Sequence, residues 1–429
     1  MNETANLASP ATLNNVELLS QPITLPNGQV IKNRLAKSAM SEALATIDNR
    51  PTPLLDKLYK RWSAGGTGLL ITGNIMVDRK ALGEPNNVAL ENDRDMAALR
   101  RWVEAGSANN TQLWVQLNHP GKQVPKGLNS RALGPSAVPF DKKMQSFFET
   151  PQELTEEEIR DIIKRFATSA SLAEEAGFSG AQIHGAHGYL VSQFLSPHHN
   201  RREDQWGGSL ENRMRFVKEI YRAIRERTGS DFAVSIKMNS ADFQKGGFTE
   251  EESLTVMKEL SGLGIDLIEV SGGTYEAPAM SGAERYKSKA KESTLKREAY
   301  FLSFAEKVRG EVSVPLMVTG GFRSQQGMAD ALRTGAMDLV GLARPLALDP
   351  EFSANLLTEG EVESPVKQIK TGIKMIDDMG MMDVAWYARQ IKRLAQGKNI
   401  NLKENPLLAL IKILASNGVQ IFRNRRVRA

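Results

Sequence analysis

Two histidines and a tyrosine follow an apolar stretch near the middle of this sequence. His184, His187 and Tyr189 are separated by small residues, and residues 177–183 before them have the composition of a buried strand entered from a helix. Imidazole and phenol groups donate hydrogen bonds and can transfer protons. Enzymes built on barrels place such groups at the C-terminal ends of strands, so this segment is a candidate active site.

The same histidines allow two other interpretations. Taken alone, a His-x-x-His spacing favours a buried, hydrogen-bonded pair of imidazoles. A metal site is disfavoured, because the chain has five histidines, no cysteine and no His-Glu-x-x-His motif. We therefore expect no metal ligands in this segment.

Glycine turns near the end of the sequence point to a phosphate-binding site. Gly320 and Gly321 follow one apolar stretch, and Ala343 and Arg344 follow the next. Barrels commonly hold a phosphate between the loops after strands seven and eight, where backbone N–H groups and a helix N-terminus favour an anion. Arg344 could add a bidentate contact. The alternative is a pair of ordinary tight turns; both turns together with the arginine favour the phosphate.

Gln116 and Lys237 each lie in or at the end of an apolar stretch. If their side chains point inward, an amide and a cation face the mouth of a barrel. A lone buried glutamine or lysine is usually a paired structural group, so these two residues alone carry little weight.

Chemistry at strand ends requires parallel strands, and the sequence repeats a suitable unit. Helix-like segments end at glycine, and short β-rich segments follow them. Eight strands are predicted at residues 33–40, 66–73, 112–117, 177–185, 232–238, 264–272, 314–319 and 335–342. Eight alternating units predict a (β/α)8 TIM barrel of the α/β class. A doubly wound sheet is the alternative, but no strand is followed by Gly-x-Gly-x-x-Gly.

Turn and helix signals agree with this scaffold. Residues 23–31, with Asn-Gly at their centre, predict an N-terminal β-hairpin. Helix starts are predicted at two capping boxes and two further N-caps, namely Thr155 with Glu158, Thr249 with Glu252, Ser209 and Ser324.

Two segments exceed a simple barrel. Residues 118–154 form a long loop after a strand, which is usually an active-site wall or lid. Residues 356–429 are predicted as a C-terminal helical extension of a barrel domain spanning 1–355. One of its helices, 407–416, has an apolar stripe that we expect to pack on the barrel or on a partner subunit, consisting of Leu407, Leu410, Ile411 and Leu414.

Composition narrows the class of protein. The chain has 429 residues, 41% of them apolar and 24% charged, which is typical of a globular protein. The absence of cysteine excludes disulfides, thiolate nucleophiles and cysteine-ligated iron–sulfur clusters. The polar N-terminus and the lack of a long apolar run predict a soluble, cytoplasmic protein. Between 361 and 429 there are 13 Lys and Arg against 6 Asp and Glu, and we interpret this basic tail as a solvated end.

One block of sequence resembles a known family. Residues 184–197 and then 200–213, including Trp206-Gly207-Gly208-Ser209 and Glu211-Asn212-Arg213, resemble the old yellow enzyme family of FMN-dependent oxidoreductases. The similarity is to its NADH:flavin oxidoreductase / NADH oxidase branch. It extends over roughly residues 15–355, the part of the chain that is predicted to form the barrel.

The resemblance implies a role for each candidate residue. His184 and His187 are expected to bind the substrate carbonyl oxygen, and Tyr189 to donate a proton to the α-carbon. Lys237 takes the place of the family's usual arginine near flavin N1 and O2, where a positive charge stabilises the reduced ring. The remaining residues expected to bind FMN are Ser38, Ala39, Met40, Ser41, Asn74, Gln116, Gly320, Gly321, Ala343 and Arg344.

The sequence departs from the family pattern at several positions. Lysine at 237 keeps the charge but loses the planar fork of arginine. Ser41 stands where some relatives have cysteine or threonine, Asn74 where many have alanine, and Ala43 where some have tyrosine. These differences bear on substrate range and flavin potential.

The combined expectation is an ene-reductase. NADH or NADPH reduces FMN, and hydride then passes to the β-carbon of an α,β-unsaturated carbonyl. A flavin reductase or NADH oxidase that delivers electrons to quinones or oxygen is the enzymatic alternative. A flavin-carrying protein that binds membranes through Arg423, Arg425, Arg426 and Arg428 is a further one, which we disfavour. We expect small-molecule enone or quinone substrates and no nucleic acid partner, and the sequence leaves a homo-oligomer open.

Overall fold

The computed structural model describes residues 12–142, 144–273, 300–358, 360–373, 376–377 and 381–428. Side chains are described up to residue 416 and at 418. The side chains of Arg423, Arg425, Arg426 and Arg428, considered above for membrane binding, therefore lie outside the described residues.

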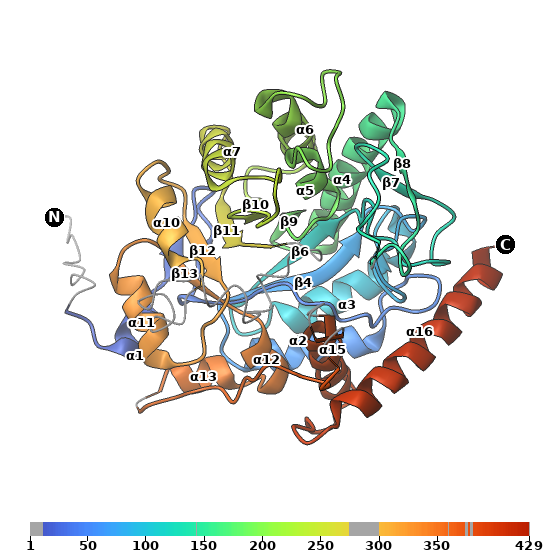
Figure 1. Ribbon diagram of the computed structural model, residues 1–429. Coiled ribbons are helices and arrows are strands. Elements are labelled where there is room, and N and C mark those ends of the chain that lie inside the picture. Colours follow the sequence, from blue (N-terminus) through green and yellow to red (C-terminus); the bar gives the residue numbers. More distant parts are fainter. Residues whose placement is uncertain are drawn as a thin grey trace.

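Eight parallel strands close into a barrel, as predicted (Figure 1). Closure is made by β3, which pairs in parallel with both β13 and β4. The strands are buried along nearly their whole length, which is typical of parallel sheets covered by helices. In chain order they are β3 (Leu35–Lys37), β4 (Leu69–Met76), β6 (Gln112–Asn118), β9 (Gly180–Gly185), β10 (Ala233–Asn239), β11 (Leu267–Ser271), β12 (Leu316–Thr319) and β13 (Leu339–Leu342).

Helices surround the barrel. The outer ring comprises α2 (Pro53–Ala64), α3 (Met96–Gly106), α4 (Glu156–Ala176), α6 (Leu210–Arg227), α7 (Glu250–Gly262), α10 (Leu302–Arg309), α11 (Gln325–Arg333) and α12 (Arg344–Leu348). Both predicted capping boxes form, at the starts of α4 and α7. The two predicted serine caps also form, at the starts of α6 and α11. Shorter helices are α1 (Asn15–Ser20), α5 (Leu190–Leu195) and α13 (Phe352–Leu356).

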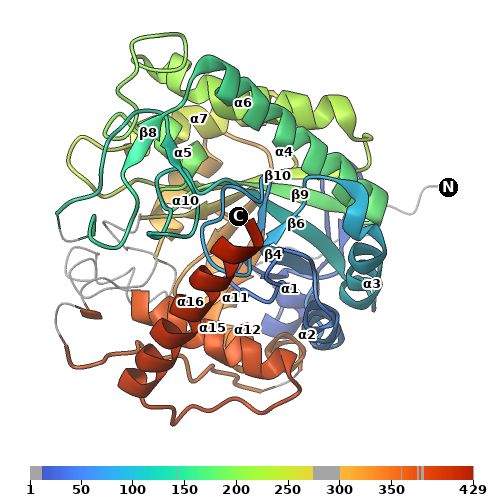
Figure 2. The same cartoon turned by 90° about the vertical axis from the view of Figure 1, so that its right-hand side faces the viewer.

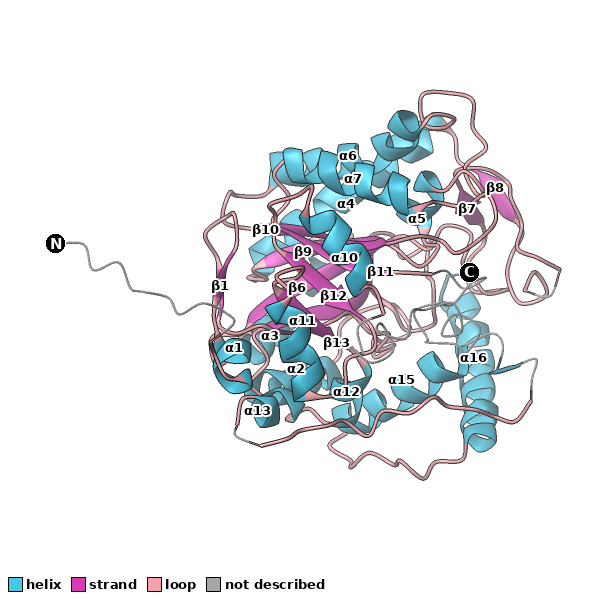
Figure 3. Ribbon diagram, turned by 60° about the vertical axis from the view of Figure 1, so that its left-hand side comes forward, coloured by secondary structure: helices cyan, strands magenta, loops and turns pink. Residues whose placement is uncertain are grey.

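The predicted hairpin plugs one end of the barrel. Strands β1 (Ile23–Thr24) and β2 (Val30–Ile31) pair antiparallel, and Figure 3 shows β1 at the end opposite β7 and β8. Its apolar side chains pack with the lower layer of the barrel interior, which includes Leu69, Trp114 and Leu267. The N-terminal end of the barrel is therefore closed and dry.

Polar side chains fill the upper part of the interior instead. Alternation along β11 turns Leu267, Glu269 and Ser271 to the inside, while Ile268 and Val270 pack outward on the helices. The side chains of Glu269 and Ser271 are nonetheless buried. A buried polar layer at the C-terminal ends of the strands marks where a ligand would bind.

The C-terminal extension packs against the outside of the barrel. Helix α15 (Met381–Ala395) fills the space between α12 and α2, and α16 (Pro406–Arg428) follows it (Figure 2). In the predicted stripe, Leu410 packs on the core together with Ala409 and Ile413. Leu407, Ile411 and Leu414 are exposed on the single chain, so the contact face of α16 is rotated from the predicted stripe.

None of the helices in the described part of the chain is both long enough and apolar enough to span a membrane.

Candidate active site

The turn after β9 brings the two histidines and the tyrosine together. The ring centroid of His184 lies 5.3 Å from that of His187 and 4.7 Å from that of Tyr189. His187 and Gly188 have φ angles of 61° and 77°, in the left-handed region. Such a φ is uncommon for a residue other than glycine and persists only where surrounding structure holds it.

Three segments hold His187 in this conformation. Its backbone N–H donates to Asn239 Oδ1 at 3.1 Å, and its carbonyl accepts from Gln123 Nε2 at 2.7 Å. Its ring Nε2 lies 2.9 Å from Ser271 Oγ. The imidazole is thus fixed by β10, by the loop after β6 and by the end of β11.

Both imidazoles are neutral at pH 7. Burial lowers the pKa of His184 well below 6.5, and the neighbouring His187 and Lys237 lower it further. Burial, and then the charge of Lys237, lower the pKa of His187 in the same direction. Each neutral ring carries one N–H that can donate a hydrogen bond.

One buried atom of this pair lacks a partner. Nδ1 of His184 forms no hydrogen bond with any described residue. An unsatisfied buried polar group costs about 1–3 kcal/mol, so native proteins keep few of them, and those few call for a functional explanation.

The predicted wall packs on this turn. Residues 118–154 contain the short parallel strands β7 (Ala132–Gly134) and β8 (Pro151–Glu153). The carbonyl of His119 accepts from the N–H of Leu190, directly after Tyr189. Gln193 of α5 accepts from the N–H of Lys122 at 3.2 Å. The segment therefore shapes one side of the site.

Strand register assembles the polar layer beside the histidines. Gln116 pairs with Gln182 across β6 and β9. Lys237 lies between His184 on β9 and Glu269 on β11. Lys237 Nζ forms a buried ion pair with Glu269 Oε1 at 2.8 Å. The side chains of Gln116 and Lys237 point inward, a direction that the sequence left open.

The turn after β3 completes this side of the site. Ser38 Oγ lies 2.7 Å from Thr319 Oγ1 on β12, and Ser41 hydrogen-bonds Glu84. A Cβ added to Gly73 would come within 2.3 Å of the Met40 carbonyl oxygen, so glycine is required where β4 approaches this turn. Ala39 packs with the barrel core between Ser38 and Met40.

Asn74 lies across from this turn on β4. Its Oδ1 accepts from Asn118 Nδ2 at 3.1 Å, and the β4–β6 register places Asn74 beside Gln116. The Asn74 and Gln116 amides therefore belong to the same polar surface.

The two glycine turns also lie side by side. Thr319 pairs with Gly341 across β12 and β13, so the residues that follow each strand are neighbours. Gly320 and Gly321 have φ angles of 131° and 97°. The guanidinium of Arg344 lies over the ring of Tyr387 in α15, 5.9 Å from its centroid.

Two N–H groups in the first turn of α11 already have acceptors. The N–H of Gln325 donates to the Val362 carbonyl, and that of Gly327 donates to the Ser324 hydroxyl at 3.1 Å. The chain's own groups therefore already occupy part of the helix N-terminus that the sequence analysis proposed for the phosphate.

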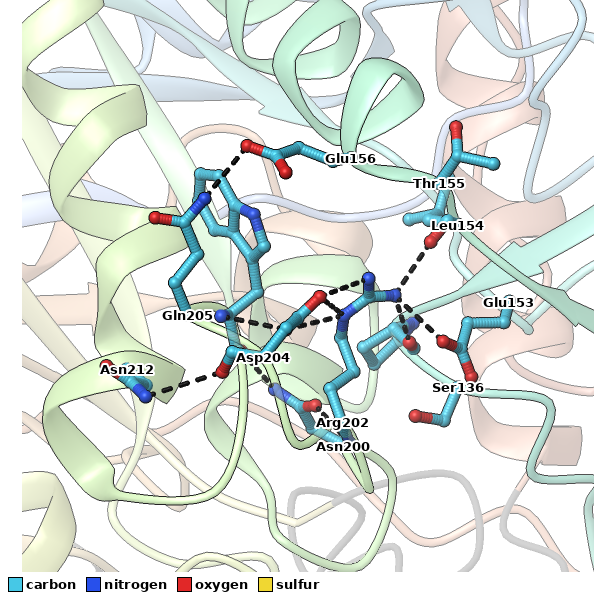
Figure 4. Close-up of polar contacts among 12 residues, drawn as sticks. Ser136, Glu153, Leu154, Thr155, Glu156, Asn200, Arg202, Asp204, Gln205 and Asn212 are labelled. Carbon is cyan, nitrogen blue, oxygen red and sulfur yellow. Dashed lines mark hydrogen bonds and ion pairs between the residues drawn. The ribbon is translucent and has the colours of Figure 1, made fainter.

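The second half of the recognised sequence block has a structural role. Arg202 donates to the Pro135 and Leu154 carbonyls at 3.0 and 2.7 Å and forms ion pairs with Asp204 and Glu153 (Figure 4). Asn200 Nδ2 donates to the Phe194 and Trp206 carbonyls, each at 2.8 Å. These contacts tie the loop before α6 to β8 and to the start of α4.

Comparison with known proteins identifies the family. The model of the NADH:flavin oxidoreductase / NADH oxidase family matches residues 18–361. The chain belongs to this family. It is an oxidoreductase that uses FMN as cofactor and NADH or NADPH as electron donor, as predicted.

Relatives in this family are similar over most of the chain. An NADH-dependent flavin oxidoreductase, iliE, of Hypocrea jecorina is 37% identical over 80% of this chain and 90% of its own length. The iliE protein of Neonectria sp. is also 37% identical, but this chain spans only 50% of its length. An NADPH dehydrogenase of Geobacillus sp. is 31% identical over 78% of this chain and 92% of its own length.

Solved structures share the fold. Morphinone reductase in complex with tetrahydroNAD has a TM-score of 0.67 at 22% identity, covering 81% of this chain and 92% of that one. The old yellow enzyme homologue from Zymomonas mobilis also has a TM-score of 0.67, at 21% identity, and covers 83% and 95%.

Sequence analysis did not identify several residues of this family member's site. Glu269, Gln182 and Thr319 join Lys237 and Gln116 in one hydrogen-bonded network, and Asn239 and Ser271 hold His187. The sequence does mark Glu269 as unusual, because a single carboxylate interrupts the mostly apolar strand 267–271. Its partners could not be named without the register of four neighbouring strands.

Proposed function

We propose that this flavoprotein is an ene-reductase that saturates an alkene conjugated to a carbonyl group. The observation that carries the proposal is the turn of His184, His187 and Tyr189. It combines a phenol with two neutral imidazoles that lie near the buried Lys237, and one imidazole nitrogen forms no hydrogen bond with any described residue. Such a set can bind a carbonyl oxygen and supply a proton.

The described residues fit FMN. Gly320 and Gly321 would present their backbone to a phosphate beside Ala343 and Arg344, because glycine adopts their left-handed φ angles without strain. Since the first turn of α11 is already capped, the glycine turn and Arg344 would bind the phosphate, and Arg344 would turn from Tyr387 toward it.

The ring of FMN would lie on the polar layer. The turn after β3 would lie along the ring, Asn74 beside it, Gln116 at the pyrimidine edge and Lys237 near N1 and O2. The residues of that turn are Ser38, Ala39, Met40 and Ser41. When bound, FMN supplies hydride transfer from reduced nicotinamide to the substrate.

The histidines would stabilise the charge that develops on the substrate oxygen. When hydride reaches the β-carbon, electron density moves to the carbonyl oxygen, which becomes enolate-like. N–H groups of His184 and His187 that donate to that oxygen would be in place beforehand and would need no reorganisation at that moment. Neutral imidazoles serve this role across the neutral pH range, because their pKa values are depressed.

Tyr189 would complete the reduction. Its phenol proton moves to the α-carbon of the enolate-like species. The double bond between the α-carbon and the carbonyl carbon then becomes single, and the carbonyl group is restored. The phenolate then recovers a proton from water. A phenol with a usual pKa near 10 is protonated at neutral pH and can act as this acid.

Two half-reactions test the proposal. Anaerobic stopped-flow should show bleaching of the flavin by NADH or NADPH, followed by its return on mixing with cyclohexenone, with saturated ketone as the product. If cyclohexenone left the reduced protein unchanged while quinones or oxygen reoxidised it, the protein would be a quinone reductase or NADH oxidase, as the family's description also allows.

A further inference from the structure

Glu269 occupies the centre of the polar layer. Its side chain is fully buried in the middle of β11. The carboxylate accepts from three groups: Lys237 Nζ at 2.8 Å, Gln182 Nε2 at 2.8 Å and Thr319 Oγ1 at 2.7 Å. Two of these donors are neutral and the third is the ammonium group of Lys237.

An ionised carboxylate only accepts hydrogen bonds, so it fixes the orientation of the amides beside it. Gln182 must direct its nitrogen to Glu269, which leaves its oxygen for Gln116. Gln116 Nε2 donates to that oxygen at 2.8 Å. The Gln116 carbonyl oxygen is therefore left for a ligand. The small Ser235, paired with Gln182 on the strand between β9 and β11, leaves room for this bridge.

The same carboxylate fixes the hydroxyls on its other side. Thr319 directs its proton to Glu269, so it can only accept from Ser38, 2.7 Å away. Ser38 must then donate to Thr319, and its oxygen lone pairs face outward as acceptors. One buried group therefore sets donor and acceptor roles at Ser38 and at Gln116.

We propose that Glu269 is a positioning and charge-balancing residue for the FMN ring. It orients Gln116 so that its carbonyl oxygen accepts from the N3–H of the pyrimidine edge. It also pairs Lys237, so the field of that cation at the ring is partly cancelled. This inference rests on the proposed FMN site and adds a determinant of reduction potential to it.

The direction in which Glu269 shifts the reduction potential of the flavin follows from its pairing with Lys237. Reduction places negative charge near N1 and O2 of the ring, and an unpaired Lys237 would stabilise it strongly. The paired Lys237 stabilises it less, so Glu269 lowers the reduction potential of the bound flavin.

The test is the reduction potential of Glu269→Gln, an isosteric change that removes only the charge. The equilibrium constant for two-electron reduction should rise roughly tenfold to a hundredfold, or about 30–60 mV. FMN affinity, measured by fluorescence titration of the apoprotein, should fall, since the new amide can donate and disturbs the relay. An unchanged potential in the FMN-loaded variant would overturn the proposal.

Asp266→Asn is the matched control. Asp266 precedes β11, is buried and forms an ion pair with Arg225, but it lies at the opposite, N-terminal end of the strand. Its replacement should lower the free energy of unfolding and leave the reduction potential unchanged. An equal shift in both variants would mean that the potential reports general loosening of β11.

Gln182→Met separates orientation from charge and serves if Glu269→Gln does not fold. The Lys237–Glu269 pair remains, while the link to Gln116 is lost. FMN affinity should fall, and the reduction potential should change less than in Glu269→Gln. Unaltered affinity would show that the hydrogen bonds from Glu269 through Gln182 to Gln116 do not position the flavin. If the wild-type protein bound no FMN, the proposed function itself would be refuted. If the wild type bound FMN but the variants had its affinity and reduction potential, only this inference would be refuted.

Discussion

The recognised sequence block folds into two halves with opposite character. In the first, around His184, the backbone enters the left-handed region and a buried nitrogen forms no hydrogen bond with the residues that the structure describes. In the second, around Arg202, the guanidinium reaches two carbonyls and two carboxylates (Figure 4). Sequence similarity marks both halves alike, and each keeps a buried nitrogen with no hydrogen bond to a described residue. That of the first half, His184 Nδ1, lies in a ring beside a second histidine and a phenol, whereas that of the second half, Trp206 Nε1, belongs to an indole, which donates hydrogen bonds but does not transfer protons. The difference indicates which half acts on a ligand and which holds the loops in place.

The largest expected effect lies in the first half. Tyr189→Phe should slow reoxidation of the reduced protein by an enone by roughly 10²- to 10⁴-fold, the usual contribution of a positioned general acid. Reduction by NADH or NADPH should stay close to wild type, because that step needs no proton from the phenol. Stopped-flow absorbance measures both rates.

A quinone is the control acceptor for this variant, since it needs no proton on carbon. Equal slowing with enone and quinone would mean that Tyr189 only shapes the pocket.

The next largest effect lies in the second half and concerns stability. Arg202→Met should lower the free energy of unfolding by about 2–4 kcal/mol, because charge-assisted hydrogen bonds to two carbonyls are lost. Enone turnover per folded, FMN-loaded molecule should be unchanged. Urea denaturation and stopped-flow on the same sample measure the two quantities.

Arg222→Met is its control, because Arg222 forms an exposed pair with Glu219, and its loss should cost at most about 0.5 kcal/mol. If folded, FMN-loaded Arg202→Met protein turned over the enone more slowly than wild type, the second half of the block would also take part in the reaction.

The imidazoles should show an intermediate effect on binding. His184→Ala or His187→Ala should weaken a phenolic ligand tenfold to a hundredfold, since a charge-assisted hydrogen bond is worth roughly 1.5–3 kcal/mol. The long-wavelength charge-transfer band gives the affinity by titration. Wild-type affinity in both variants would show that the histidines are a structural pair only.

A smaller effect is expected at Ser271. Ser271→Ala removes the partner of His187 Nε2, and phenol affinity should fall about two- to tenfold for one neutral hydrogen bond of roughly 0.5–1.5 kcal/mol. Titration of Ser240→Ala, a buried serine on the neighbouring strand's end, provides the comparison. A loss as large as that of His187→Ala would place Ser271 itself on the ligand.

The contribution of the two histidines to the free energy of unfolding should depend least on pH near neutrality. Because the folded-state pKa values of His184 and His187 lie below 6.5, the unfolded chain takes up protons first as the pH falls. The stability from the neutral rings is complete above pH 6.5 and is lost as the pH falls from there toward the folded-state values. The free energy of unfolding of His184→Gln should depend less on pH between 6.5 and 5. An unaltered slope would show that His184 is not buried in its neutral form.

Local sequence predicted the scaffold well, for identifiable reasons. Strand starts near Gly66, Gly177 and Gly264 were marked by glycines that end helices, and capping boxes such as Thr155 with Glu158 fix helix starts. The turn at His184 was visible as a motif. The role of Glu269 was not, because it depends on barrel closure, which brings Thr319 and Gln182 to the same carboxylate from different strands. The contact face of α16 also depended on packing rather than on periodicity alone.

The fate of a labelled hydride tests the central claim most directly. The protein should be supplied with NADH or NADPH carrying deuterium at the transferred position, in ordinary water, with 2-methylcyclohexenone as acceptor. The account predicts a saturated ketone with one deuterium at the β-carbon and a hydrogen from water, delivered to one face, at the α-carbon. Oxidation of the nicotinamide with no labelled ketone formed, its electrons recovered in quinol or hydrogen peroxide, would contradict it.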